Sequence, residues 1–203
     1  PTHEPVEQEA QIRLMEKLKN HHGKNSVLVL RPAEAQETTV AWKMAMENTD
    51  TPTALIFSRQ NINDLPAGNN YSMAERGAYI VAGSDENPDV VMVASGSEVS
   101  TLVAGAELLR KDGVKCRIVS VPSEGLFRRQ SKEYQESVVP TGAKVFGMTA
   151  GLPVNLQGFL IGAAPESRIW GLESFGFSAP YKVLDEKLGY TGENVYNQVK
   201  SML

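Results

Sequence analysis

Arg59 is the clearest candidate for chemistry, because it lies just beyond the apolar run TALIF at residues 53–57. Such a run is typical of a buried strand, and ligands of open parallel sheets collect beyond the carboxyl ends of the strands. A guanidinium at that place can bind a phosphate or a carboxylate through two parallel hydrogen bonds. A surface arginine paired with a nearby acid would give the same pattern, so position alone leaves both interpretations open.

His3 is one of only three histidines in the chain. An imidazole titrates near neutral pH, so it can donate, accept or shuttle a proton. A lone histidine in a terminal segment is, however, more often a solvated side chain than a catalyst. His21 and His22 stand in the polar stretch KNHHGKN without further metal ligands nearby, so the sequence predicts no metal site there.

The stretch SGSEVS at residues 95–100 joins an expected strand to an expected helix. Gly96 permits a tight turn, and Ser97 can cap the helix. Free amides at a helix start can bind an anion. An ordinary strand-to-helix turn looks the same, and the motif is neither a P-loop nor a complete GxGxxG fingerprint. We therefore interpret it as a structural turn.

Composition excludes several classes of protein. The net charge is −4 over 203 residues, which disfavours nucleic acid or an anionic membrane surface as a partner. No apolar run approaches the length of a membrane span, and the single cysteine cannot form an internal disulfide, so the cytoplasm is the expected location. That cysteine, Cys116, stands in the strand-like run KCRIVSV, where an inert core thiol is expected.

The first unit of the chain has the pattern of a strand, a helix and a second strand. Residues 26–30 form an apolar run, residues 33–47 have helical spacing and a proline in the expected first turn, and residues 53–57 are apolar again. Strand, helix and strand within about thirty residues predict a parallel βαβ unit. Too few strands are present to cover its apolar faces, so we expect this unit to pack on the rest of the chain or on another chain.

A linker is predicted at residues 61–76, where proline, glycine and paired asparagines break the apolar periodicity. A second alternating unit follows and closes with a helix that Thr191 is expected to cap. Its expected strands are residues 77–82, 90–94, 116–121, 144–148 and 169–173, and its expected helices are residues 98–111, 123–139, 155–162 and 191–203. The fold class is therefore α/β, with a mainly parallel sheet flanked by helices at residues 73–203 and a partial α/β domain before it at residues 1–66.

Several stretches together resemble the transketolase family, in order and over nearly the whole chain. They are PTHEPVEQ at 1–8, RPAEAQETTVAWKMAM at 31–46, PTALIFSRQN at 52–61, ASGSEVS and its continuation to residue 127, ESFGFSAP at 173–180 and LGYTGENV at 188–195. The first three resemble the end of the family's pyrimidine-binding domain, and the others resemble its C-terminal domain. Each stretch alone is a weak signal, but the combination is specific.

The resemblance implies an enzyme that uses thiamine diphosphate with Mg²⁺ or Ca²⁺ and moves a two-carbon ketol unit between ketose and aldose phosphates in the pentose phosphate pathway. It implies that His3 has a catalytic role and contacts the substrate, and that Arg59 binds the substrate phosphate. It also implies a homodimeric parent enzyme. Departures from the family pattern are Glu4 in place of the usual glutamine, Glu173 in place of a common aspartate, and MTAGLPVN at residues 148–155 without the expected acidic residue.

The family's Gly-Asp-Gly element, its cofactor-activating glutamate and the aromatic residues around the pyrimidine ring are not in this chain. We therefore expect the chain alone to bind no cofactor and to have no ketol-transferase activity. A start inside the PTH motif favours a piece cut from a larger enzyme over a naturally split subunit. Two alternatives stay open: a non-catalytic assembly or regulatory module, and part of a related thiamine enzyme such as a 2-oxoacid dehydrogenase beta subunit or a deoxyxylulose-phosphate synthase.

Overall fold

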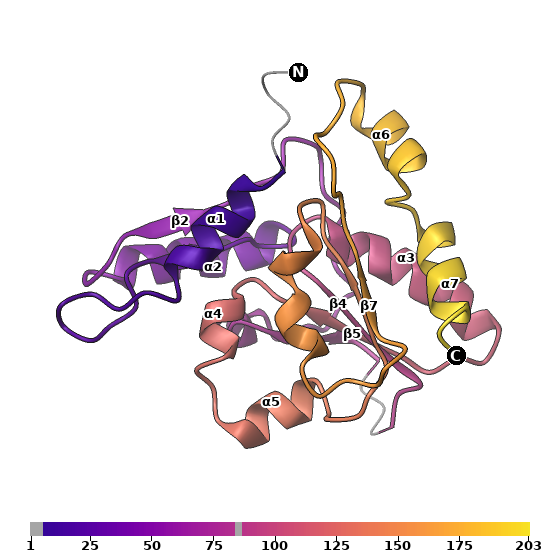
Figure 1. Cartoon of the computed structure of the whole chain (residues 1–203), viewed down its shortest axis with the longest axis horizontal. Helices are drawn as coiled ribbons and strands as arrows, with labels where there is room; N and C mark the ends of the chain where they lie inside the picture. Colours follow the sequence, from indigo (N-terminus) through magenta and orange to yellow (C-terminus); the bar gives the residue numbers. More distant parts are fainter. Residues whose placement is uncertain (1–5, 84–86) are drawn as a thin grey trace.

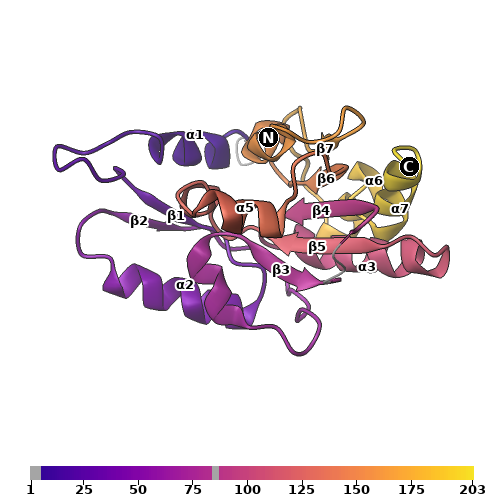
Figure 2. The ribbon, with the colours of Figure 1, turned by 90° about the horizontal axis from the view of Figure 1, so that it is seen from below.

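The computed structural model describes residues 6–83 and 87–203. A five-stranded sheet with helices on both faces forms the larger part, and a two-stranded sheet with its own helices lies beside it (Figure 1). Seen from below, the N-terminal elements extend along one side of the larger sheet (Figure 2). The expected α/β architecture is therefore confirmed, and the N-terminal unit packs on the rest of the same chain.

The N-terminal unit contains the expected βαβ arrangement. Strands β1 (Leu28–Leu30) and β2 (Thr53–Leu55) pair in parallel, with α2 (Ala35–Glu47) between them in sequence. Every residue of β1 is buried, which explains its purely apolar sequence. An additional helix, α1 (Gln8–Met15), precedes β1 and was not expected from the sequence.

Helix α2 begins two residues later than the apolar spacing predicts. Glu34 is extended, and its carboxylate accepts a hydrogen bond from the backbone N–H of Glu37 at 2.6 Å. This satisfies one of the free amides of the first turn, as a helix cap does. Pro32 therefore lies before the helix and not in its first turn.

The larger sheet has the strand order β3-β5-β4-β6-β7. Its strands are β3 (Tyr79–Ala82), β4 (Val90–Ala94), β5 (Cys116–Ser120), β6 (Val145–Met148) and β7 (Arg168–Trp170). Only β3 runs antiparallel, at one edge, so the prediction of a mainly parallel sheet is confirmed for the described residues.

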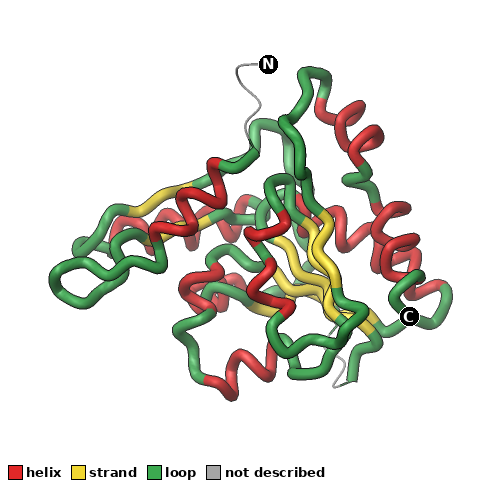
Figure 3. The backbone as a smooth tube through the Cα atoms, in the orientation of Figure 1, coloured by secondary structure: helices red, strands yellow, loops and turns green. Residues whose placement is uncertain are grey.

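Alternate residues of the central strand serve two separate cores. Met92 on β4 packs with α3 (Glu98–Lys111) and α7 (Gly192–Lys200), whereas Val93 packs with α4 (Glu124–Phe127) and α5 (Lys132–Val138). Because successive strand residues point to opposite faces, a sheet covered on both sides needs an unbroken apolar run. Figure 3 shows these helices on either side of the strands.

Three expected elements differ from the structure. Residues 123–139 form two helices, because the Ser131 hydroxyl accepts from the N–H of Tyr134 and starts α5 anew. Residues 155–162 contain short 3₁₀ turns, η2 (Pro153–Asn155) and η3 (Gln157–Leu160), in place of an α-helix. The expected linker contains η1 (Tyr71–Arg76), which packs against α2.

At the C-terminal end of the chain, the predicted helix cap is confirmed, but one helix was not predicted. Thr191 caps α7 as expected, because its hydroxyl accepts from the N–H of Asn194 at 3.2 Å. Helix α6 (Tyr181–Leu188) was not expected, and none of its residues is buried. Cys116 is buried as expected, and burial raises the pKa of its thiol to about 11, which keeps it in the unreactive thiol form.

Candidate functional site

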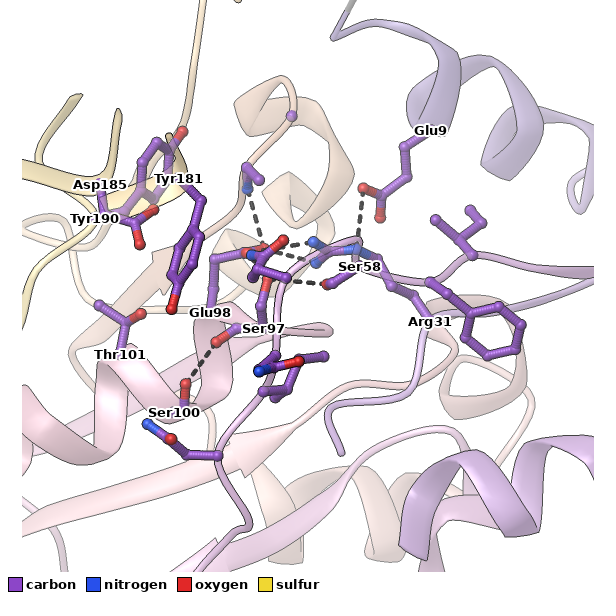
Figure 4. Close-up of a pocket in the computed structure, with 18 of the residues that line it drawn as sticks. Glu9, Arg31, Ser58, Ser97, Glu98, Ser100, Thr101, Tyr181, Asp185 and Tyr190 are labelled. Carbon is purple, nitrogen blue, oxygen red and sulfur yellow. Dashed lines mark hydrogen bonds and ion pairs between the residues drawn. The ribbon is translucent and has the colours of Figure 1, made fainter. Parts of the chain in front are cut away.

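A cleft of about 640 Å³ lies between the N-terminal unit and the rest of the chain. Ser58 follows β2 and Ser97 follows β4, and both line this cleft. Its position beyond the carboxyl ends of parallel strands is where open sheets place ligands. Figure 4 shows Tyr181, Asp185 and Tyr190 on the side of the cleft away from Glu9.

Arg31 forms the centre of a buried ion-pair network at the cleft. It follows β1 directly, and its guanidinium makes two parallel hydrogen bonds to Glu98, at 2.6 and 3.2 Å. The same side chain donates to the carbonyl oxygen of Ser95, and its Nε lies 3.6 Å from the Glu9 carboxylate. Burial acts to lower the pKa of Arg31, but Glu98 and Glu9 outweigh it and raise the pKa, so the guanidinium stays charged.

Arg13 extends this network on helix α1. Its Nε donates to Glu9 at 2.9 Å, and its Nη2 donates to the Ser95 hydroxyl at 3.0 Å. Burial alone would raise the pKa of Glu9, but the charges of Arg31 and Arg13 hold it below its usual value. Two guanidiniums and two carboxylates balance one another, so this network holds the chain together and offers no net positive charge to a phosphate.

A chain of hydrogen bonds connects the network to the segment after β2. The Ser58 hydroxyl donates to the Ser97 hydroxyl at 3.2 Å, and Ser97 in turn donates to Glu98 at 2.7 Å (Figure 4). The N–H of Ala150 also donates to Glu98, at 3.1 Å. The expectation that Ser97 caps α3 with its side chain is therefore wrong, because its hydroxyl donates to the carboxylate of the next residue and accepts no hydrogen bond from the N–H groups of α3.

The wall formed by α6 and α7 carries weakly acidic groups. Burial, and then the negative charge of Glu98, raises the pKa of Asp185. Tyr190 donates its hydroxyl to the carbonyl oxygen of Thr149 at 3.0 Å, and burial raises the pKa of this phenol. Among the described residues, this side of the cleft therefore offers polar groups without a cation, which suits hydroxyl-bearing ligands better than anions.

Arg59 lies at the edge of the cleft. Ser58 and Gln60 line the cleft, but Arg59 between them does not, and it is exposed. Within residues 6–83 and 87–203, its side chain makes no hydrogen bond or ion pair. Arg59 is thus not paired with an acid of the described chain, and its charge is available to a ligand. His3 lies outside the described residues, so its role stays a prediction.

The sequence reasoning missed Glu9, Arg31 and Glu98 as residues of this site. A usable signal existed for Arg31, because it follows an expected strand just as Arg59 follows the next one. Glu98 stands in the first turn of an expected helix, where a carboxylate is common for electrostatic reasons alone. Nothing in the local sequence indicates that the two residues meet.

The part of the chain that the structure describes does not contain a metal site. Across residues 6–83 and 87–203, no three His, Cys, Asp or Glu side chains lie close enough together to hold an ion. In the same ranges no helix is both long and apolar enough to cross a membrane.

Comparison with known proteins identifies the family. The model of the transketolase-like C-terminal domain matches residues 77–191, and the model of the transketolase pyrimidine-binding domain matches residues 1–64. The chain belongs to the transketolase family. This membership favours transketolase over the two related classes of thiamine enzyme.

Transketolases of known sequence or structure are similar to this chain over its whole length or nearly so. Transketolase from Staphylococcus aureus is 40% identical over 205 residues, which cover 100% of this chain and 29% of the relative. The solved transketolase from Leishmania mexicana is 34% identical, with a TM-score of 0.84 over 100% of this chain and 28% of that chain. A split-gene transketolase, solved as an inactive beta4 tetramer, shares the fold at 22% identity and a TM-score of 0.72, over 98% of this chain and 62% of that one. The chain thus spans less than a third of the length of the S. aureus transketolase.

Proposed function

We propose that this chain supplies the end of the pyrimidine-binding domain, residues 1–66, and the C-terminal domain, residues 73–203, of a transketolase. The complete enzyme transfers a two-carbon ketol unit from a ketose phosphate to an aldose phosphate. The observation that carries the proposal is Arg59, a cation without a partner among the described residues, at the carboxyl end of β2 in a chain of this family. A guanidinium there can bind a phosphate by two parallel hydrogen bonds.

The charges at the cleft support a phosphate at Arg59 and not deeper inside. Arg31 is already engaged by Glu98 and Glu9, and Asp185 and Glu98 add negative charge to the interior. A phosphate there would have to displace a buried carboxylate, which is unfavourable. At the cleft edge, Arg59 meets no such competitor among the described residues. His3 is proposed to contact the substrate hydroxyls near the reacting carbons.

Thiamine diphosphate and its Mg²⁺ or Ca²⁺ are proposed to bind elsewhere in the complete enzyme. The described residues do not fit the metal and its diphosphate, because they contain no cluster of metal ligands and their buried arginine is already paired with carboxylates. We therefore assign no step of the reaction to a cofactor held by this chain. Its residues bind and orient the sugar phosphate and pack against the remainder of the enzyme, proposed to be a cytoplasmic homodimer without nucleic-acid or membrane partners.

A second candidate function is a non-catalytic assembly or regulatory module, and it applies to residues 73–203. This part contributes three side chains to the network, and each already has a partner: Ser95 is bound by Arg13, Glu98 is bound by Arg31, and Ser97 donates to Glu98. Such saturation favours packing over proton transfer in this part of the chain. The two proposals are compatible, since the C-terminal domain can hold the residues that bind substrate.

A coupled ketol-transfer assay with thiamine diphosphate and magnesium tests the proposed function. We expect no turnover from the chain alone, and turnover when it is assembled with the remaining part of a transketolase. In that assembly, Arg59→Ala should raise KM for phosphorylated substrates by roughly 10- to 100-fold, the effect of losing hydrogen bonds to a charged group.

Arg129→Ala is the matched control, because Arg129 is also exposed but does not lie on the cleft. It should leave KM unchanged. Turnover by the isolated chain would contradict the proposed dependence on a second part. Equal KM values for the Arg59→Ala and Arg129→Ala enzymes would contradict the role of Arg59.

A further inference from the structure

Three successive residues after β2 are each held by a different contact. The N–H of Ile56 donates to the carbonyl oxygen of Leu30 at 2.9 Å and extends the β1–β2 pairing. The ring of Phe57 stacks on Trp42 of α2, with centroids 6.3 Å apart. Ser58 donates to Ser97 at 3.2 Å. The next residue is Arg59. The backbone that leads to Arg59 is therefore fixed as far as Ser58, the residue before it.

Only the last of these contacts comes from the C-terminal part of the chain. Ser97 is itself held, since its hydroxyl donates to Glu98, and Glu98 receives hydrogen bonds from Arg31 and from the N–H of Ala150. Glu98 and Arg31 are buried, so solvent does not compete with these bonds. Ser58 is therefore attached to a rigid support and not to a mobile surface group.

We propose that Ser97 is a positioning residue for Arg59: through Ser58, the C-terminal part of the chain sets the direction of the arginine that binds the substrate phosphate. This inference rests on the proposed function, because it assumes that Arg59 binds that phosphate. It gives the turn at the start of α3 a role in substrate selection. Since Ser97 acts through Arg59, its effect is confined to substrates that carry a phosphate.

The physical reason is the geometry of a bidentate contact. A guanidinium and a phosphate must be coplanar and correctly spaced to form two hydrogen bonds, so small displacements of the backbone weaken binding. Losing one neutral hydrogen bond between side chains changes such an equilibrium by about three- to tenfold. Unphosphorylated substrates do not use the guanidinium in this way and should not respond.

Hydrogen exchange on this chain tests the positioning directly. In Ser97→Ala, the backbone amide of Ile56, which donates to Leu30 two residues before Ser58, should exchange about three- to tenfold faster, because the Ser58 anchor next to it is lost. Ser97→Thr keeps the hydroxyl and should restore slow exchange. Ser100→Ala is the matched control, since Ser100 lies on the same helix and donates to the carbonyl oxygen of Ser97 and not to the segment after β2.

Kinetics of the enzyme assembled with the remaining part of a transketolase test the consequence. Ser97→Ala should raise KM for a phosphorylated aldose about three- to tenfold, with kcat unchanged and with unchanged KM for glycolaldehyde, which has no phosphate. Ser97→Thr should restore the wild-type KM. A role of Ser97 in folding alone would instead affect both substrates equally.

The outcomes separate this inference from the proposed function. If wild type and Arg59→Ala behave as proposed but Ser97→Ala changes neither exchange nor KM, the positioning role is wrong and the function stands. If Ser97→Ala changes KM equally for the phosphorylated aldose and for glycolaldehyde, the positioning role is also wrong. If wild type transfers no ketol unit after assembly, the proposed function fails, and the inference fails with it.

Discussion

Arg31 and Arg59 each follow a strand of the same parallel pair, but their surroundings give them different roles. Arg31 is buried and makes two hydrogen bonds to Glu98, whereas Arg59 is exposed and makes no contact with a charged partner among the described residues. A buried charge must be paired, so Arg31 stabilises the junction between the two parts. An exposed and unpaired guanidinium is free to bind a ligand.

Glu37 allows a prediction about pH at the scale of a single residue. This carboxyl group is buried and receives hydrogen bonds from the N–H of Ala33 and from the hydroxyl of Tyr79, both at 2.8 Å. Burial raises its pKa above the usual 4.5, and the hydrogen bonds offset only part of that effect. The folded protein therefore keeps this proton to a higher pH than the unfolded chain does.

Since the folded state binds the extra proton, its stabilising effect is complete below pH 4.5 and is lost as the pH rises through the raised pKa of Glu37. Compared with Glu37→Gln, the wild type should thus lose free energy of unfolding as the pH rises above 4.5 and through the raised pKa of Glu37, as measured by urea denaturation. Glu47→Gln, at an exposed position on the same helix, should follow the wild type. A constant difference between wild type and Glu37→Gln across this range would show that Glu37 does not titrate as inferred.

At the scale of elements, the packing of α3 against α7 depends on two glycines. A Cβ added at Gly105 would overlap the side chain of Val195 and lie 3.2 Å from the carbonyl oxygen of Gly192. A Cβ added at Gly192 would lie 2.9 Å from the Cβ of Ala104. The two helices therefore approach more closely than larger residues would allow, and this contact closes one face of the sheet.

Gly105→Ala should lower the free energy of unfolding by about 1–3 kcal/mol, because overpacking outweighs the better helix propensity of alanine. Urea denaturation measures this change. Adding Val195→Ala removes the overlapping side chain, so the double variant should be less destabilised than the sum of the two single changes. A more stable Gly105→Ala protein, or strict additivity, would argue against a close contact at this point.

The elements that sequence reasoning found and those it missed differ in how much apolar surface they bury. Strand β4 is buried along its whole length, and its run VVMVA is evident in the sequence. In α1 the one buried residue is Arg13, and α6 has no buried residue. Both helices have eight residues, which is shorter than the window of about 11–18 residues in which helical periodicity is recognised.

At the scale of the whole molecule, polar contacts attach the N-terminal unit to the larger sheet. Besides the pair of Arg31 with Glu98, Glu37 accepts a hydrogen bond from Tyr79 on β3. Glu16 accepts hydrogen bonds both from the Ser123 hydroxyl and from the N–H of Val29 in β1, so the junction also organises the small sheet. A sheet of two strands is at best marginally stable alone, so the N-terminal unit depends on this junction.

We therefore expect one cooperative unfolding transition for both parts. The two tryptophans provide separate probes, because Trp42 lies on α2 and Trp170 on β7. Trp170→Phe leaves Trp42 as the single tryptophan, and Trp42→Phe leaves Trp170. In each variant, the urea midpoint from tryptophan fluorescence should equal the midpoint from circular dichroism of the same variant within error. An earlier transition at Trp42 would mean that the N-terminal unit unfolds independently.

The sequence by itself determined the fold class, the βαβ unit, the cap at Thr191 and the family resemblance, because these depend on residue types and spacings over short distances. It also singled out Arg59, since a strand and the residue beyond it are neighbours in the chain. Only the tertiary structure decided that Arg31 meets Glu98 and that Ser58 meets Ser97. Those partners are 67 and 39 residues apart, and their meeting depends on how the two sheets pack, which no local pattern records.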